Sequence, residues 1–301
     1  MKRKLIELGG GCLVVSIPSK FVKRNKLKKG GEVEVEDNGN YLTVASEKSQ
    51  ESQKLILDTT EFKNFNRRIL NFVYKSGYDE VKIVFDDQEI LRQVESILPY
   101  LIGFEIVDQQ PNYIILKNIA SGIDEEFDRL LRRIFLSLKS FAGNIAASLE
   151  ENDINSLNEI KLMEQNNNRM TDFLLRILKK KGFTEEDRIL FIYSIIRDLE
   201  KIGDFYRNIC YTLIREDPEK INKELVSILK LVNAYYEMYY DIFYSKKPDL
   251  SGLFDSYDEI KQKSLEIFDR LDESSRKVIP YVMHIAYTIN HLVGPYYELN
   301  F

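Results

Sequence analysis

The chain has 301 residues, of which 44% are hydrophobic and 30% are charged, and its formal net charge is −5. This composition is long and apolar enough for two or more packed domains and excludes a wholly disordered chain. No apolar run approaches the roughly 20 residues of a membrane-spanning helix, and the apolar stretch after Met1–Lys4 is too short for a signal peptide. We therefore expect a cytoplasmic protein without membrane insertion.

The charge is unevenly distributed along the chain. Between Lys2 and Lys29 nine cations stand against one anion, Glu7, so this segment carries nine minus one, or about +8. The rest of the chain is acidic. A basic N-terminal segment on an acidic body indicates two partners of opposite charge.

The two cysteines, Cys12 and Cys210, lie in stretches that are typical of a strand and of a helix in different domains. Neither has a second thiol nearby that could form a CxxC motif or a metal-binding pair. We expect both to be small buried hydrophobic residues. The lack of a disulfide framework fits a reducing compartment.

Residues up to Ser46 are typical of short strands that are joined by turns. The predicted elements are strands at 4–7 and 12–17, a turn at 9–11, a short helix from Ser19 to Arg24 and a hairpin at 32–44. A piece of this size buries too little apolar surface to be stable alone, so we expect it to dimerise.

This order of elements resembles the AbrB/SpoVT-type swapped-hairpin DNA-binding domain, in which two chains interlace into one β-barrel. The phrases that carry the resemblance are Val15-Ser16-Ile17-Pro18, Phe21-Val22 and Leu27-Lys28-Lys29-Gly30-Gly31-Glu32-Val33. Gly31 departs from the family, which usually has aspartate there.

The resemblance covers residues 1–47 and implies a homodimer that binds DNA through a basic face. The DNA contacts that it implies are Arg3, Lys4, Lys20, Lys23 and Arg24. The alternative is that the lysines only keep a small barrel soluble, and that the barrel serves for dimerisation alone.

A polar linker at 47–53 precedes a predicted small α/β domain at 53–119. The expected order is strand, helix, strand, helix and a final hairpin, at 54–58, 62–74, 81–85, 87–98, 104–107 and 112–116. Asp58 or Thr60 is expected near the start of the first helix, and Asp86-Asp87 is expected to cap the second. The domain has no glycine-rich phosphate loop, no histidine and no nucleophile beside a base, so we interpret it as a spacer or a small-ligand sensor.

From Asp124 onward almost the whole chain is predicted to be helical, in two three-helix units at 122–216 and 217–301. The helices are expected at 127–149, 154–181, from Thr184 onward, 221–244, 252–271 and 274–296. The apolar seam of the last helix, from Ile279 to Tyr296, repeats that of the third, from Ile192 to Ile209. This repetition indicates an internal duplication.

The third helix contains the run Arg197-Asp198-Leu199-Glu200-Lys201-Ile202-Gly203-Asp204. Glu200 and Asp204 are four residues apart and lie off the apolar stripe, so their carboxylates stack on an outer face of the helix. Two carboxylates in this arrangement could share a cation. They could equally form ordinary ion pairs with Arg197, Lys201 and Arg207, and the spacing leaves both possibilities open.

The run closely resembles the signature of PhoU-type phosphate-uptake regulators and differs mainly in Lys201, where the family has arginine. The resemblance implies tandem three-helix repeats and a divalent or ferric metal ion held at the first repeat only. The metal ligands that it implies are Glu200, Asp204 and Glu164 of the preceding helix. Asn168 stands where the family usually offers a second acidic residue, and a neutral amide is a weaker ligand for hard cations.

In the second repeat Tyr287 and His291 take the positions of Glu200 and Asp204, so we expect no second metal cluster. His284 and His291 are two turns apart, too far to share an ion, and are expected to be surface or helix-packing residues. The aromatic run from Tyr235 to Tyr244 is expected to pack against neighbouring helices.

These observations predict a multidomain α+β protein with an N-terminal swapped-hairpin β-barrel, a small α/β middle domain and C-terminal all-α tandem three-helix bundles. The expected function is that of a homodimeric DNA-binding transcriptional regulator of phosphate uptake with a PhoU-like sensor body. The alternative is a PhoU-like protein-interaction regulator of a phosphate transporter or a sensor kinase. An enzyme is the weakest interpretation, since no general base or nucleophile is arranged near the carboxylates.

Overall fold

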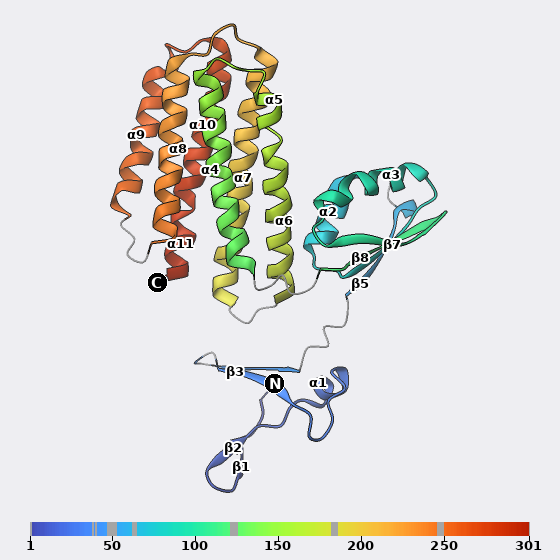
Figure 1. The fold of residues 1–301 in the computed structure, drawn as a ribbon. Helices are drawn as coiled ribbons and strands as arrows, with labels where there is room; N and C mark the ends of the chain where they lie inside the picture. Colours follow the sequence, from blue (N-terminus) through green and yellow to red (C-terminus); the bar gives the residue numbers. More distant parts are fainter. Residues whose placement is uncertain are drawn as a thin grey trace. The chain divides into compact units, whose positions relative to one another are not determined.

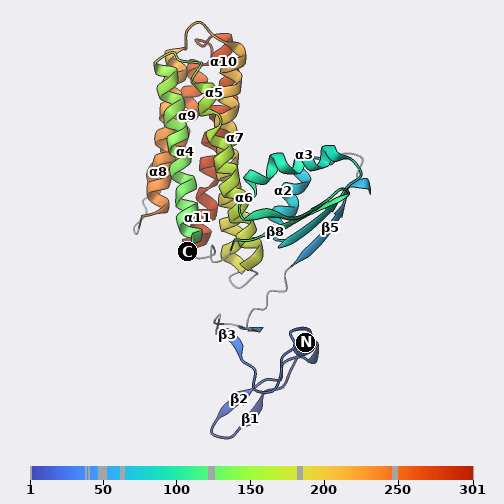
Figure 2. The ribbon, with the colours of Figure 1, turned by 45° about the vertical axis from the view of Figure 1, so that its right-hand side comes forward.

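The structure is a computed structural model, and it describes residues 2–37, 39, 41–46, 53–61, 65–120, 126–181, 186–245 and 250–300. The chain divides into two compact units, Met1–Ser52 and Gln53–Phe301. The first contains short strands, and the second contains a four-stranded sheet followed by long helices (Figures 1 and 2). The protein is therefore a mixed α+β chain with a helical C-terminal region, which confirms the fold class in these coarse terms.

The N-terminal unit consists of two hairpins and one short helix. The first hairpin pairs β1 (Ile6–Leu8) with β2 (Cys12–Val14), and the second pairs β3 (Val33–Asp37) with β4 (Leu42–Ser46), both antiparallel and in separate sheets. Gly10 and Gly11 make the predicted turn with φ of 74° and 80°, a backbone region that glycine adopts without steric cost. Helix α1 (Ser19–Arg24) follows Pro18, as predicted.

None of the described residues of this unit has a buried hydrophobic side chain. Leu5, Leu8 and Leu13 are 65%, 60% and 60% exposed. Cys12 is also exposed, so the prediction that it is a buried hydrophobic residue is wrong for the single chain. The reason is that the β1–β2 hairpin packs against no second layer within the described part of the unit.

The α/β part of the second unit is one sheet in the order β5-β6-β8-β7, with two helices on one face (Figure 1). The strands pair parallel between β5 and β6 and antiparallel elsewhere. The elements are β5 (Lys54–Asp58), η1 (Thr59–Glu61), α2 (Arg67–Lys75), β6 (Glu80–Val84), α3 (Gln88–Ile97), η2 (Leu98–Tyr100), β7 (Phe104–Gln110) and β8 (Tyr113–Asn118).

Side-chain caps set the starts of both helices. Asp87 accepts a hydrogen bond from the backbone N of Glu89 at 2.8 Å, which confirms it as the cap of α3. Helix α2 begins later than predicted, because Asn66 is its cap, whereas Asp58 accepts from the backbone N of Thr60 and initiates η1. Residues 62–64, where the predicted helix would begin, lie outside the described residues.

The helical region follows the predicted order with two interruptions. Its elements are α4 (Phe127–Glu150), α5 (Leu157–Ile160), α6 (Met163–Lys181), α7 (Glu186–Glu216), α8 (Lys223–Phe243), α9 (Ser251–Phe268), α10 (Glu273–His291) and α11 (Val293–Asn300). The helix predicted at 154–181 is divided where the N–H of Leu162 donates to the carbonyl of Glu159, a tighter turn than an α-helix makes. The helix predicted at 274–296 ends at His291, and the proposed start at Thr184 lies outside the described residues.

The apolar seam of α7 is fully buried, as its spacing predicts: Ile195, Leu199, Ile202, Tyr206 and Ile209 are all 0% exposed. Helix α10 packs along α7, and the ring of His284 stacks on Phe205 with centroids 5.0 Å apart, which confirms a helix-packing role for this histidine.

The predicted packing role of the aromatic run is confirmed on α8. Tyr235, Tyr236 and Tyr239 are buried, and Tyr236 and Tyr239 stack against Phe135 of α4. Cys210 is buried on α7, and burial raises the pKa of its thiol to about 12, so it behaves as the small hydrophobic residue that was predicted. Among the described helices none combines the length and apolar character that a membrane span requires.

A buried arginine joins the α/β part to the helical region. Arg176 of α6 is 2% exposed, donates from Nη1 to the carbonyl of Tyr74 at 2.9 Å, and lies over the rings of Tyr74 and Phe104. Asp79 is 3.4 Å from its Nη2 and 2.5 Å from Nζ of Lys180. These contacts attach α2 and the sheet to α6.

Candidate functional site

The N-terminal unit carries the residues that were predicted to contact DNA. Lys20, Lys23 and Arg24 lie on one face of α1, whereas Arg3 and Lys4 lie in the segment before β1, and all five are exposed. The guanidinium of Arg24 lies over the ring of its own helix's Phe21, 5.8 Å from the centroid.

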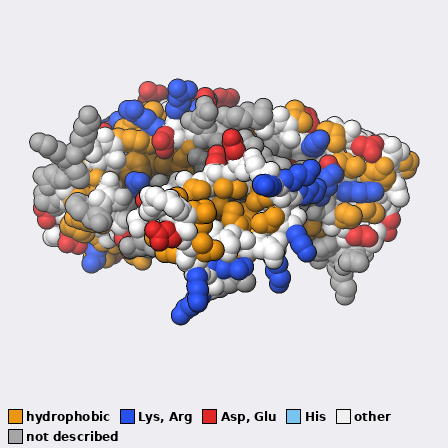
Figure 3. All heavy atoms as spheres, turned by 90° about the horizontal axis from the view of Figure 1, so that it is seen from below, with side chains coloured by type: hydrophobic (Ala, Val, Ile, Leu, Met, Phe, Trp, Pro, Cys, Tyr) orange, Lys and Arg blue, Asp and Glu red, His pale blue; other side chains and the backbone are white. Residues whose placement is uncertain are grey.

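The basic side chains of the N-terminal unit lie on its surface. All nine Lys and Arg side chains between Lys2 and Lys29 are exposed, and none lies within ion-pair distance of a carboxylate among the described residues. Figure 3 shows one face of the whole molecule, on which Lys and Arg side chains project beside hydrophobic ones; the exposed cations of the N-terminal unit are those between Lys2 and Lys29. Such a surface attracts polyanions without sequence preference at first contact.

The second candidate site is a row of charged side chains between α6 and α7. Glu164 of α6 is 3% exposed and accepts from Nη1 of Arg207 at 2.6 Å and from the amide of Asn168. The same Nη1 lies 3.0 Å from Oδ1 of Asp204. The structure therefore brings Glu164 and Asp204 together, and the cation between them is a guanidinium.

Burial dominates the electrostatics of Glu164. Desolvation raises the pKa of Glu164 to about 7, although the charge of Arg207 acts to lower it, and the neighbouring carboxylate of Asp204 raises it further. A carboxyl group with such a pKa changes its charge near neutral pH. It can therefore bind either a proton or a cation there.

Glu200 occupies the next turn of the row and is not in contact with Glu164. It pairs with Arg197, and burial followed by the charge of Asp172 raises its pKa. Asp172 in turn lies 2.8 Å from Nζ of Lys75 on α2. These carboxylates and cations form one row, which we call the α6–α7 charge row: Lys75, Asp172, Arg197, Glu200, Asp204, Arg207 and Glu164.

Two amides, the buried Asn167 and the half-buried Asn168, lie next to the row with polar atoms that have no hydrogen-bond partner among the described residues. Asn167 is 1% exposed and neither its Oδ1 nor its Nδ2 has a partner, and the Oδ1 of Asn168 also has none. A side chain at Gly203 would place its Cβ 3.3 Å from Cδ2 of Leu138 and 3.9 Å from Nδ2 of Asn167. The absence of a side chain at Gly203 therefore lets the neighbouring helices approach α7 closely.

The oxygen atoms available here suit a hard cation in type, because carboxylate and amide oxygens are the usual ligands of such ions. Glu164 and Asp204 supply two carboxylates, and Asn167 and Asn168 supply amide oxygens without partners. A metal ion at this point would take the place of the Arg207 guanidinium. Among the described residues no group of three or more His, Cys, Asp or Glu side chains is arranged to hold a metal.

On α10, His291 contacts α7, whereas Tyr287 does not become buried. His291 of α10 places Nδ1 2.8 Å from Oδ2 of Asp198, which is 2% exposed on α7, and Lys201 lies 2.8 Å from the other oxygen of Asp198. Tyr287 is 57% exposed. His291 therefore links α10 to α7, which confirms the predicted helix-packing role.

Sequence reasoning missed Asp172 and Lys75, which extend the charge row to α2. A signal for Asp172 was present, because Glu164, Asn168 and Asp172 are spaced by four and so share one face of α6. No local signal could reveal Lys75, since it reaches the row from another domain. Comparisons with protein-family models, with curated proteins and with solved structures find no match for this chain.

Proposed function

We propose that this protein is a homodimeric DNA-binding transcriptional regulator of phosphate uptake, with an AbrB/SpoVT-like N-terminal barrel and a PhoU-like sensor body of tandem three-helix bundles. The observation that supports it most directly is the pairing of two features in the first unit. Its cations are exposed and unpaired among the described residues, and its hydrophobic side chains are exposed as well.

The exposed hydrophobic side chains support dimerisation. A single copy leaves Leu5, Ile6, Leu8 and Leu13 more than half exposed on or beside the β1–β2 hairpin, and Val35 is 58% exposed on β3. Each apolar side chain that a second copy covers contributes roughly 1.5–3 kcal/mol. Interlaced hairpins from two chains would supply the missing layer and would also double the positive charge on the surface.

The free cations support DNA as the partner. A dimer presents two copies of Arg3, Lys4, Lys20, Lys23 and Arg24 to the phosphates, and each phosphate contact releases counterions. Binding of phosphate, a metal or a transporter component to the helical body would then change DNA occupancy through the shared chain.

The test is a mobility-shift titration of the full chain against DNA from upstream of phosphate-transport genes, with random duplex as the comparison. We expect tighter binding to the upstream DNA and a steep loss of affinity with salt. The double variant Lys23→Glu/Arg24→Glu should abolish the shift. The matched double reversal Arg133→Glu/Lys261→Glu, at exposed positions of α4 and α9, should leave it unchanged.

The protein-interaction alternative predicts a different result. If the barrel serves only for dimerisation, the unaltered chain would show no preference among DNA duplexes. The Lys23→Glu/Arg24→Glu variant would remain dimeric and would still capture a phosphate transporter component or a sensor kinase. A shift that discriminates upstream DNA and disappears with the reversal excludes that alternative.

Metal binding at Glu164, Glu200 and Asp204 is a separate part of the proposal. Glu164 and Asp204 would hold the ion together, with Glu200 one turn away, and Arg207 would move aside. Elemental analysis of the purified chain tests this. The double variant Glu164→Gln/Asp204→Asn should lose the metal, whereas Glu150→Gln, an exposed change on α4, should retain it.

A further inference from the structure

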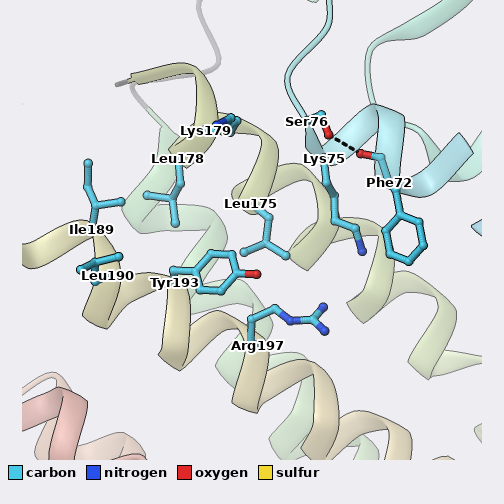
Figure 4. A pocket seen from close by; sticks show the side chains of 10 residues that line it. All are labelled: Phe72, Lys75, Ser76, Leu175, Leu178, Lys179, Ile189, Leu190, Tyr193 and Arg197. Atoms are coloured by element: carbon cyan, nitrogen blue, oxygen red, sulfur yellow. Dashed lines mark hydrogen bonds between the residues drawn. The ribbon is translucent and has the colours of Figure 1, made fainter. Parts of the chain in front are cut away.

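A pocket of about 470 Å³ lies inside the second unit, where α2 of the α/β domain meets α6 and α7. Its volume falls in the range of pockets that enclose drug-sized ligands, roughly 300–1,000 Å³. Figure 4 shows side chains from all three helices surrounding it. The pocket is distinct from the Glu164–Asp204 pair, although it reaches the opposite end of the α6–α7 charge row.

One end of the pocket is apolar. Leu178 of α6 and Ile189 and Leu190 of α7 form this end, and the ring of Phe72 forms part of the opposite wall (Figure 4). Leu190 and Phe72 are 61% and 64% exposed, so the pocket leaves large hydrophobic side chains in contact with water. An apolar ligand body would cover them, which is favourable in proportion to the area removed from water.

The other end is polar and positively charged. Lys75 and Arg197 point toward the same region from α2 and α7, and the hydroxyl of Tyr193 is directed toward them (Figure 4). None of the described residues that line the pocket is acidic. A ligand head group at this end would meet an ammonium, a guanidinium and a phenol, all of which can donate hydrogen bonds.

The charges around the pocket fix the charge of the head group. Lys75 is paired with Asp172 at 2.8 Å and Arg197 is paired with Glu200, so each of these cations has one carboxylate behind it. Lys179, the third cation of the lining, has no ion-pair partner among the described residues. Among the described side chains of the pocket and their ion-pair partners, three cations therefore stand against two carboxylates, which favours a ligand with one negative charge.

From this combination we infer that the pocket binds a monoanionic amphiphile, with a single apolar chain or ring system and one carboxylate head. The body lies against Leu178, Ile189 and Leu190, and the carboxylate accepts from Arg197, Lys75 and the hydroxyl of Tyr193. A carboxylate there competes with Glu200 and Asp172 for their cations, so occupancy of the pocket changes the charge balance of the row. The inference concerns the second unit alone and does not depend on DNA binding.

The experiment is isothermal titration calorimetry of the full chain with decanoate below its critical micelle concentration, compared with decanol and with acetate. We expect decanoate to bind one site per chain at least about tenfold more tightly than decanol, because a charge-assisted hydrogen bond is lost with the head group. Acetate should not bind measurably, since it lacks the apolar body.

Two sets of variants locate the binding. Leu190→Glu, at an exposed position, places a negative charge beside the apolar end and should weaken decanoate binding at least about tenfold. Leu265→Glu on α9, where the side chain is 72% exposed and does not line the pocket, should leave binding within about twofold. Arg197→Gln should weaken decanoate but not decanol, and Arg197→Lys should restore most of the difference.

Three results would overturn the inference. They are no heat of binding with decanoate, equal affinity for decanoate and decanol, and an equal loss of affinity in Leu265→Glu and Leu190→Glu. Equal affinity would mean that the head group is not recognised, and an equal loss would place the binding elsewhere on the surface. Circular dichroism spectra of the variants establish that they fold. If Leu190→Glu does not fold, the comparison of Arg197→Gln with Arg197→Lys decides the question.

Discussion

Replacing Arg176 with alanine should separate the α/β domain from α6 and lower the free energy of unfolding by about 3 kcal/mol. The guanidinium is 2% exposed, donates to the carbonyl of Tyr74 at 2.9 Å and lies 5.1 and 4.9 Å from the ring centroids of Tyr74 and Phe104. Removing a buried charge-assisted hydrogen bond costs about 1.5–3 kcal/mol, and a desolvated cation–π contact contributes about 2 kcal/mol.

Breaking a buried ion pair usually costs roughly 3–5 kcal/mol. Two features of the surroundings place the loss of stability in Arg176→Ala at the lower end of this range. In Arg176→Ala, Asp79 would still form its ion pair with Lys180 at 2.5 Å. The carbonyl of Tyr74 would still accept a hydrogen bond from the backbone N–H of Gly77 at 3.1 Å, so neither group is left without a partner. The guanidinium is also costly to bury, since desolvation lowers the pKa of Arg176.

The Arg176→Met variant separates packing from charge. Methionine keeps much of the apolar stem between the two rings, so we expect a smaller loss, about 1–2 kcal/mol. Urea unfolding followed by far-ultraviolet circular dichroism measures both variants, because the chain has no tryptophan. Arg133→Ala, at an exposed position of α4, is the control and should change stability by less than about 0.5 kcal/mol. An Arg176→Ala variant as stable as that control would refute the argument.

Three further predictions follow from local features. Gly103→Ala should destabilise the fold by about 2 kcal/mol or more in urea unfolding, because φ is +84° and the new Cβ would lie 2.7 Å from Cβ of Ala120. Asp272→Ala should lower the stability by about 1 kcal/mol in thermal unfolding, since Asp272 caps α10 through the backbone N–H of Ser275. Burial alone would raise the pKa of Asp272, but its hydrogen bonds lower the pKa below the usual value of 3.8. The stabilisation by the Asp272 carboxylate should therefore disappear as the pH falls below 3.8. In metal-free buffer the folded state holds the proton of Glu164 more tightly than the unfolded chain, so stability should fall as the pH rises from 4.5 to about 7, and Glu164→Gln should flatten that dependence.

Local patterns in the sequence predicted the elements and the buried seam of α7 well. The three- and four-residue spacing from Ile195 to Ile209 identifies the face that is buried, because that face is set by helix geometry alone. Asp87 was predicted as a cap for the same reason, since its hydrogen bond reaches only two residues along the chain. Local rules failed at Leu162 and Leu292, where predicted helices are interrupted.

Contacts between domains could not be predicted from spacing. Arg176 lies on the same helix as the site residue Glu164, yet its partners Tyr74 and Asp79 are about a hundred residues away in sequence. The exposure of Cys12 has the same origin, because burial of the β1–β2 hairpin requires a second layer that the described part of the single chain does not supply. The sequence indicates which residues are apolar, and the tertiary arrangement decides what covers them.

The α6–α7 charge row shows why carboxylate spacing alone cannot distinguish a metal site from ion pairs. Four-residue spacing places Glu200 and Asp204 on one face in either case. The outcome depends on which cation reaches them, and here Arg207, three residues after Asp204, also reaches Glu164 on the facing helix at 2.6 Å. Because one guanidinium serves both the buried Glu164 and the partly exposed Asp204, any metal ion that enters must displace it and satisfy both carboxylates, so metal binding and the position of Arg207 are coupled.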